Sequence, residues 1–403
     1  MEHSLIRAEA ALAPKPAHVP DDLVRDFDMA RCADTGDVHR YWKEEVQDRL
    51  PDIFWTPHHG GHWVATRAAD ILAIQRDPGL FSNGEFVIPR GIVPKLIPLQ
   101  LDPPRHTAYR RLFMPFFVPR ALTDIEARAR AVAIELIEGL RPRGECEFIG
   151  DFAGVMPIVA FLTMMHLPHD DLAMLRERAT LASKPHFEGS AQAWEDLSAY
   201  IRDCIAARRA QPGTDPVSAM LQAEVDGERL SDDDVFSMCL LLLTGGLDTV
   251  ATMIGFIAHY LATHPELQAQ LREDPARIPD AVQEFVRRLG ISNLGRLVTR
   301  DAAYRGIAFA RDDMILLPMP LVGLDDRLNA DPMDFMLDRS ERHYSTFGVG
   351  PHACPGKVLA QREMTIFLQE WLTRLPPFRL KAGAPPVFTS SLINSVEALH
   401  LSW

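Results

Sequence analysis

One cysteine lies in a frame of glycine and proline that could hold a functional sulfur. The frame reads Phe347-Gly348-Val349-Gly350-Pro351-His352-Ala353-Cys354-Pro355-Gly356. An amphipathic helix is predicted from about Lys357 to Leu375, so Cys354 would lie just before a helix N-terminus, where the dipole and free N–H groups stabilise a thiolate. Pro355 suits the first helical position, and Gly350 and Gly356 would let the backbone approach a flat ligand closely.

Two other interpretations of Cys354 need to be weighed. Most free cysteines are ordinary buried thiols, but that reading does not account for the glycines and prolines on both sides. A nucleophilic cysteine would need a base, and His352 is too close along the chain to be an obvious partner. The frame therefore favours a functional sulfur.

A second candidate is the polar group Gly245-Gly246-Leu247-Asp248-Thr249 in the middle of the apolar stretch from Val235 to Ala262. The stretch is long enough to span a bilayer, but Asp248 at its centre would cost roughly 2.5–3.5 kcal/mol there, and no basic cluster flanks it. Ser231 and the three aspartates after it indicate the N-cap and acidic first turn of a long helix. We expect a helix that is buried on all sides inside a large protein. Its central glycines and acid–alcohol pair are poor helix formers, which fits either a satisfied kink or a functional groove.

Two charged pairs have helical spacing. His106 and Arg110 are four residues apart after Asp102-Pro103-Pro104, and Glu284 and Arg287 are three apart. Each pair would share one helix face. Taken alone, both patterns are common on solvated helices.

Together these segments resemble the cytochrome P450 monooxygenases. Phe-x-x-Gly-x-x-x-Cys-x-Gly is the haem-binding signature of that family, and Phe347, Gly350, Cys354 and Gly356 match it in full. The resemblance runs from about Asp22 to Trp403. It implies a mainly α, triangular fold with a small β portion, in which haem b lies between a long central helix and the cysteine loop. Cys354 would be the axial ligand of the iron.

The resemblance also implies roles for the other segments. Thr249 would hydrogen-bond the iron-bound oxygen and Asp248 would relay protons, because splitting the O–O bond needs protons in a dry site. His106 and Arg110 would bind the haem propionates, since buried carboxylates must be matched by cations, and Arg296 and His352 match other positions that do the same. Glu284 and Arg287 would form a structural cluster with a later arginine, for which Arg339 is the candidate.

Several segments look like the bacterial camphor-hydroxylating branch, which takes electrons from a two-iron, two-sulfur ferredoxin and its reductase. A basic patch on the thiolate side could steer such a ferredoxin; its candidates are Arg105, Arg110, Arg111, Arg342 and Lys357. The tyrosine that binds the substrate ketone in that branch has no counterpart between residues 86 and 98. By analogy the pocket would be mostly apolar, lined by Phe86, Leu96, Leu241, Thr244, Gly245, Ile291, Ser292 and Ile393. We therefore expect a small rigid terpenoid, a monoterpenoid or norisoprenoid such as a cyclic ether, an alcohol or an ionone-like ketone, to be hydroxylated at an unactivated C–H bond.

The elements that must position these residues are mostly helical. Apolar spacings of three and four predict helices over 122–140, 192–210 and 266–273. Strand signals predict one hairpin from Ile53–Thr56 and 63–66, and a second from 304–309 and 314–317. We expect an extended arm over residues 1–21 and a single domain over 22–403.

Composition excludes several other classes of protein. The net charge is −13, from 55 acidic and 42 basic side chains, which disfavours nucleic acid and anionic membranes as partners. Five widely spaced cysteines without a Cys-x-x-Cys pair argue against a disulfide framework or zinc site, and no signal peptide is apparent, so we expect a cytoplasmic protein. Two other functions stay open: a haem-thiolate gas or ligand sensor or carrier without turnover, and a membrane-associated structural protein without haem.

Overall fold

The computed structural model describes residues 12–184 and 187–403 and is mostly helical, with small sheets. The predicted mainly α fold with a small β portion is confirmed. Residues 1–11 of the predicted arm lie outside the described residues, and residues 12–20 contain no helix or strand. The helices are α1 Val38–Arg40, α2 Ala68–Arg76, α3 Arg105–Phe113, α4 Thr123–Leu140, α5 Met156–Met165, α6 Leu172–Ala182, α7 Ser190–Ala210, α8 Pro216–Gln222, α9 Asp232–Leu247, α10 Thr249–Thr263, α11 Pro265–Glu273, α12 Ile278–Arg288, α13 Pro320–Gly323 and α14 Lys357–Arg374.

The largest sheet has five strands in the order β1-β2-β10-β7-β3. A three-stranded sheet has the order β11-β14-β4, and three pairs remain: β12 with β13, β5 with β6, and β8 with β9. The strands are β1 Ile53–Thr56, β2 His62–Ala65, β3 Phe81–Ser82, β4 Glu145–Glu147, β5 Glu224–Val225, β6 Glu228–Arg229, β7 Asn293–Val298, β8 Ala302–Tyr304, β9 Ile307–Phe309, β10 Met314–Pro318, β11 Arg379–Leu380, β12 Val387–Thr389, β13 Ser395–Ala398 and β14 His400–Ser402.

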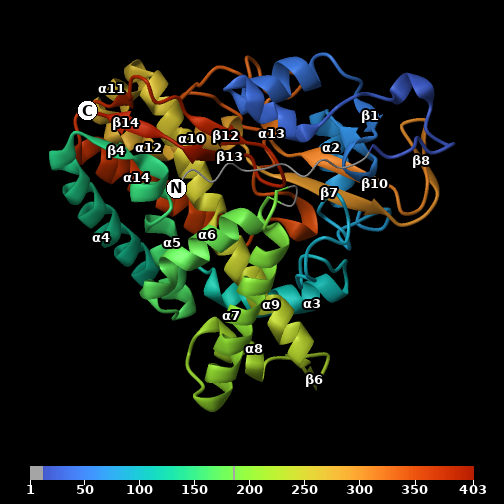
Figure 1. Ribbon diagram of the computed structural model, residues 1–403, viewed down its shortest axis with the longest axis horizontal. Coiled ribbons are helices and arrows are strands. Elements are labelled where there is room, and N and C mark those ends of the chain that lie inside the picture. The colour runs from blue at the N-terminus through green and yellow to red at the C-terminus, as the bar shows by residue number, and fades with distance from the viewer. Residues whose placement is uncertain (1–11, 185–186) are drawn as a thin grey trace.

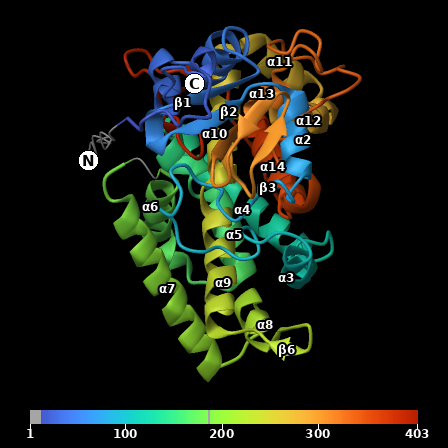
Figure 2. The same cartoon turned by 90° about the vertical axis from the view of Figure 1, so that its right-hand side faces the viewer.

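The molecule tapers from a broad end, which holds the five-stranded sheet, to a tip formed by α7, α8 and β6 (Figures 1 and 2). Helices α9 and α10 run through the middle, with α4, α5 and α14 on one side and the sheet on the other. The segment before α14 and the junction of α9 with α10 line one cavity, which is described below.

The segment from α9 to α10 is a helix of the protein core. It is long and apolar enough to cross a membrane by composition, but 61% of its most apolar window is buried inside the structure. Ser231 caps it as predicted, since its Oγ accepts a hydrogen bond of 3.1 Å from the Asp234 N–H. The expectation of a helix buried on all sides is wrong at Gly245, which is exposed. Asp248 interrupts the helix, which agrees with a kink, one of the two interpretations of this polar group.

Helix α14, which follows the cysteine loop, buries aromatic side chains in the core. Phe148, Phe152, Phe367 and Trp371 pack together, and the Phe148 and Trp371 rings meet edge to face at 4.9 Å. Such aromatic pairs contribute about 0.5–1.5 kcal/mol each beyond their burial. The cysteine at the helix N-terminus is thus fixed to a rigid element.

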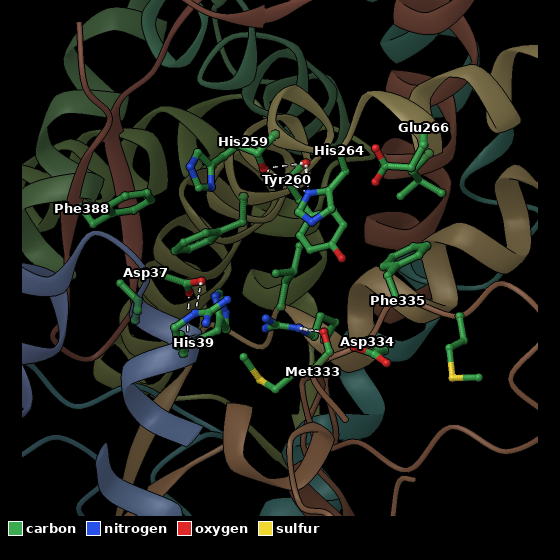
Figure 3. Close-up of a pocket in the computed structure, with 18 of the residues that line it drawn as sticks. Asp37, His39, His259, Tyr260, His264, Glu266, Met333, Asp334, Phe335 and Phe388 are labelled. Carbon is green, nitrogen blue, oxygen red and sulfur yellow. Dashed lines mark hydrogen bonds and ion pairs between the residues drawn. The ribbon is translucent and has the colours of Figure 1, made fainter. Parts of the chain in front are cut away.

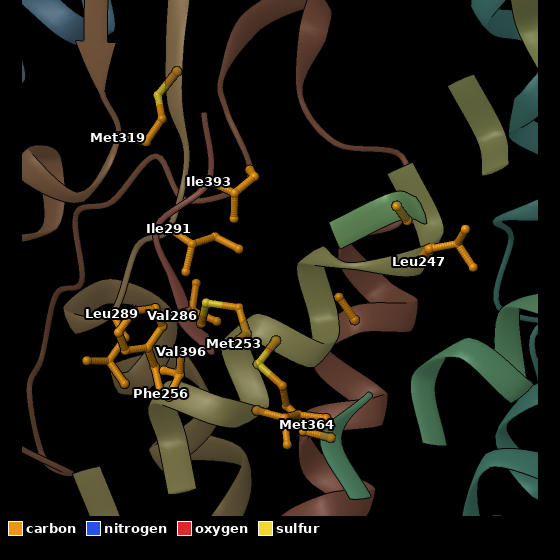
Figure 4. Packing of buried hydrophobic residues seen from close by; sticks show 14 of the residues in the cluster. Leu247, Met253, Phe256, Val286, Leu289, Ile291, Met319, Met364, Ile393 and Val396 are labelled. Carbon is orange, nitrogen blue, oxygen red and sulfur yellow. The ribbon is translucent and has the colours of Figure 1, made fainter. Parts of the chain in front are cut away.

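A second part of the core lies around α10. Met253 and Phe256 of α10 and Met364 of α14 lie close to Val286 and Val396 (Figure 4). Leucine, valine and methionine fill the space between the helices, and methionine adapts to irregular gaps. This packing forms the floor of the site described below.

The second predicted hairpin is wrong in its pairing. Strand β10 pairs with β7 on one side and with β2 on the other. The hairpin lies earlier, where β8 and β9 pair across Arg305 and Gly306, both with positive φ. The apolar residues of β10 are buried on both faces, so the strand belongs inside the large sheet, which local pattern alone does not reveal.

Candidate functional site

Cys354 is held in a loop with several backbone anchors. Its N–H donates to the Phe347 carbonyl at 2.7 Å. Thr346 Oγ1 donates to the Val286 carbonyl of α12 at 2.6 Å, and the Val349 N–H donates to Gln75 Oε1 of α2 at 3.0 Å. The loop is therefore tied to two separate helices before α14 begins.

The loop conformation itself requires glycine at position 350. Its φ is +72°, and a Cβ would lie 3.2 Å from the Gln75 carbonyl oxygen. Glycine is the residue that adopts this backbone conformation at little cost. Gly356 has a negative φ, and a Cβ there would make ordinary contact with Cys354 Sγ at 3.7 Å.

The Cys354 side chain is exposed only toward a cavity that it helps to line. Burial raises the pKa of its thiol, although the N–H groups of Gly356 and Lys357 and the charge of Arg110 act in the opposite direction. The N–H groups at the helix N-terminus act in the expected direction but do not outweigh burial. A thiolate here would require a cation against the sulfur, as a metal ion would supply.

The cavity has a volume of about 370 Å³, within the range of small-molecule sites. Every residue expected to contact substrate lines it: Phe86, Leu96, Leu241, Thr244, Gly245, Ile291, Ser292 and Ile393. Sequence reasoning missed large side chains from α5, α7 and the segment before β13, namely Phe161, Met164, Trp194 and Leu392. Their helical periodicity indicates only burial, so no local signal would have placed them here.

The break between α9 and α10 forms the cavity wall that contains Asp248 and Thr249. Thr249 Oγ1 donates to the Gly245 carbonyl at 3.3 Å, and Gly245 leaves open space where a Cβ would point. Gly246 allows close packing instead, because a Cβ there would lie 2.2 Å from Phe161. The two glycines thus have different roles. Gly245 leaves the groove open, and Gly246 lets α5 pack closely against α9.

Asp248 is buried and lies between α6 and α10. Its carboxylate accepts hydrogen bonds from Thr180 at 3.1 Å and from Ser183 at 3.0 Å. Burial raises the pKa of this carboxyl, and the charge of Lys184 only partly offsets that effect. A buried carboxyl with a raised pKa next to a cavity is suited to carry a proton.

Four nitrogen-bearing side chains expected to bind carboxylates come together beside the cysteine. The His106 and His352 rings lie 4.2 Å apart, Arg110 donates to the Ala353 carbonyl, and Arg296 donates to the Gly295 carbonyl at 2.8 Å. His106, Arg110 and His352 line the cavity, whereas Arg296 lies behind its wall. Sequence reasoning placed all four in one site, and the structure brings them together.

The electrostatics of this group fit an anion. His106 Nδ1 and both ring nitrogens of His352 are buried without a hydrogen-bond partner among the described residues. Burial, with the nearby His106 and the two arginines, lowers the pKa of His352 to about 3, and burial lowers that of Arg296 to about 10. Two guanidinium groups and buried ring nitrogens without partners form an environment that buried carboxylates would satisfy.

Glu284 is the centre of a buried ion cluster under the site. Its Oε1 lies 2.7 Å from Arg287 Nη2 and 2.9 Å from Arg339 Nε, so the structure joins the predicted pair and the arginine expected as its third member. Arg342 is a fourth member that was missed, with its Nε 3.2 Å from Glu284 Oε2. These arginines also donate to carbonyls of the 323–337 segment, which fixes the chain that leads to the cysteine loop.

Two members of the expected basic patch are used inside the protein. Arg342 belongs to the Glu284 cluster, and Arg110 points to the Ala353 carbonyl. Arg105, Arg111 and Lys357 are exposed. The free positive charge on this face is therefore smaller than the sequence indicated.

A second cavity, of about 580 Å³, lies further along α10 (Figure 3). Its lining includes Asp37, His39, His259, His264 and Arg288, and no cysteine. Among the residues that the structure describes, no group of three or more His, Cys, Asp or Glu side chains could hold a metal ion. Because no cysteine lines this second cavity, it does not fit a thiolate-bound cofactor.

His39 in this second cavity predicts a pH dependence of stability. Burial and the charge of Arg288 lower the pKa of His39 to about 4, although Asp37 and the Gly290 carbonyl oppose the shift. An unfolded histidine has a pKa of about 6.5, so between these values the unfolded chain binds more protons and falling pH favours unfolding. From about pH 7.5 to about pH 5, His39 should remove about 2 kcal/mol of stability.

The variant His39→Gln should lose less stability over that interval, because glutamine can still donate to the Gly290 carbonyl but does not titrate. Urea unfolding midpoints of both proteins at the two pH values would measure the difference. Equal pH dependence in the two proteins would show that His39 is not responsible.

Comparison with known proteins gives a consistent result over the whole chain. The family model for Cytochrome P450 matches residues 158–382. The chain is 31% identical over 411 residues to the probable cytochrome P450 127A1 of Sinorhizobium fredii, covering 99% of each chain. The crystal structure of CYP101J2 superposes with a TM-score of 0.90 at 38% identity, and that of CYP101C1 with 0.88 at 35%; each covers 97% of this chain and 100% of its own.

Proposed function

The chain belongs to the cytochrome P450 family of haem b monooxygenases, and from this premise we propose that it hydroxylates an unactivated C–H bond of a small apolar terpenoid, with electrons from a ferredoxin. The observation that supports this most directly is one cavity that contains the Cys354 sulfur, the Asp248–Thr249 pair and a largely apolar lining. No other arrangement in the described residues combines these three features.

Haem b, when bound, supplies an iron that activates dioxygen. The residues present fit this group: Cys354 would provide its axial sulfur, and His106, Arg110, Arg296 and His352 would bind its propionates. Phe347, Gly350 and Gly356 would shape the loop on the sulfur side. Thiolate ligation favours O–O cleavage because it donates electron density to the iron.

Asp248 and Thr249, which line the same cavity, would supply the proton. Asp248 would take a proton from solvent and pass it toward the Thr249 hydroxyl, which lies at the cavity surface. Proton delivery by a positioned side chain contributes typically about 10²–10⁴-fold to rate. The apolar lining excludes bulk water, so protons arrive by this route.

The substrate class rests on the lining and on similarity to the structures of CYP101J2 and CYP101C1. Phe86, Leu96, Leu241, Ile291 and Ile393 surround the space with apolar surface, while Thr244 and Ser292 add hydroxyl groups. A compact terpenoid with one oxygen atom matches this lining, and orientation would depend mainly on shape, which discriminates weakly. The ferredoxin and its reductase are proposed from the resemblance to the camphor-hydroxylating branch, and the cytoplasmic location from the widely spaced cysteines without a Cys-x-x-Cys pair.

The test is oxygen incorporation by the haem-loaded protein. With a bacterial ferredoxin, its reductase, reduced nicotinamide cofactor and isotopically heavy dioxygen, a panel of terpene ethers, terpene alcohols and ionones should give products carrying one heavy oxygen atom. Product analysis by mass spectrometry measures this. Terpenoids that shift the haem spectrum but give no product with any electron donor would instead favour a ligand-binding protein without turnover.

A further inference from the structure

A buried lysine lies between two carboxylates and is bound to the one farther from the cavity. Lys184 follows Ser183, whose hydroxyl contacts Asp248, and its side chain is only 1% exposed. Its Nζ lies 2.6 Å from Glu397 Oε2 of β13. Asp248 has no such ion pair among the described contacts and accepts hydrogen bonds from two hydroxyl groups instead.

Further hydrogen bonds keep Glu397 in the charged form that binds this lysine. Its other oxygen, Oε1, accepts hydrogen bonds from Thr389 at 2.6 Å and from Ser395 at 2.5 Å. Although burial alone would raise it, Lys184 and these hydroxyls hold the pKa of Glu397 below its usual value. Glu397 therefore stays ionised and paired, because a buried ammonium needs a fully satisfied anion.

The hydrogen bonds around Asp248 suit a carboxyl that changes its protonation. Ser183 Oγ can donate its single proton either to Asp248 or to the Thr180 carbonyl, which lies 2.8 Å away. When Ser183 donates to that carbonyl, its oxygen can accept a proton from a neutral Asp248. An ammonium bound directly to Asp248 would instead favour the charged form alone.

We propose that Glu397 is a positioning residue for proton delivery: by holding the Lys184 ammonium, it leaves the Asp248 carboxyl without an ion pair and able to carry a proton to Thr249. The inference rests on the proposed role of Asp248 in this monooxygenase. In the step, one proton leaves Asp248 for the Thr249 hydroxyl oxygen, Thr249 releases its own hydroxyl proton into the cavity, and solvent returns one proton to Asp248. Lys184 and Glu397 keep their charges throughout.

The experiment follows the protonation of Asp248 without turnover. In the haem-loaded protein, infrared spectra over a range of pH would record the C=O band of the protonated buried carboxyl, identified by its absence in Asp248→Asn. In Glu397→Gln, Lys184 loses its anion and becomes available to Asp248. The band should then disappear about one to three pH units lower than in the native chain, the effect of an opposite charge within a few ångströms.

A double variant separates the lysine from any general damage. Lys184→Met with Glu397→Gln removes the ammonium and leaves no buried unpaired charge, so the band should titrate at or above its native pH. Glu145→Gln is the matched control, because Glu145 pairs with Lys381 at 2.8 Å on the surface, and it should not move the band. The fraction of consumed cofactor recovered as product should fall in Glu397→Gln and recover in the double variant.

Two results would overturn the proposal. The Asp248 band could titrate at the same pH in Glu397→Gln and the native chain, or it could stay shifted in the double variant. Either result can be obtained whether or not a terpenoid product is ever found, so failure of this inference is distinguishable from failure of the proposed function.

Discussion

A chain in which asparagine replaces Asp248 is expected to form product about a hundred-fold to ten-thousand-fold more slowly than the native chain. Asparagine has the size of aspartate and can still contact Thr180 and Ser183, but it cannot take up and release a proton. Burial raises the pKa of the native carboxyl, which brings its proton exchange toward the working pH. The measurement is the rate of product formation at saturating terpenoid, with cofactor consumption followed in parallel.

The matched control is Asp233→Asn, an exposed aspartate in the first turn of the same helix, α9. It should keep the native rate. Both variants should bind the terpenoid and unfold as the native chain does, because neither changes the shape of the cavity. If Asp248→Asn formed product as fast as Asp233→Asn, Asp248 would have no role in proton delivery.

The second large effect is expected on folding, from Glu284→Ala. The Glu284 carboxylate is completely buried and holds Arg287, Arg339 and Arg342. Removing one partner of a buried ion pair costs about 3–5 kcal/mol, and here three guanidinium groups lose the same anion. Native proteins are stable by only about 5–15 kcal/mol, so little folded, haem-containing protein should remain.

Haem content per chain and the thermal unfolding midpoint would measure this loss. Glu145→Gln again provides the control, since its pair with Lys381 lies on the surface and such exposed pairs contribute little to stability. If Glu284→Ala unfolded at the same temperature as the control, the cluster would not hold the segment that leads to the cysteine loop.

The sequence predicted best what depends on short spacings. The frame around Cys354, the helix that follows it, the cap at Ser231 and the helical pairs at His106 and Glu284 all lie within one or two turns of chain. Their residue types state their local requirements: glycine where φ is positive, serine where an N–H needs an acceptor. The helical predictions at 122–140 and 192–210 held for the same reason.

What the sequence did not predict depends on contacts between distant segments. Strand β10 contains the same apolar residues whether it pairs with β9 or enters the large sheet, and only the tertiary structure decides. The sequence indicated a surface charge at Arg342, whereas the fold brings it against the buried Glu284. The pairing of Lys184 with Glu397 and not with Asp248 likewise follows from packing of α6 and β13 against α9 and α10.

The central claim is that Cys354 is a thiolate ligand of haem iron opposite the Asp248–Thr249 wall. The most direct measurement is the absorbance spectrum of the reduced, haem-loaded protein under carbon monoxide, compared with that of Cys354→Ala. A strongly red-shifted Soret band in the native chain, lost in the variant, is the predicted result. An unshifted band in the native chain, or the same shifted band in both proteins, would contradict it.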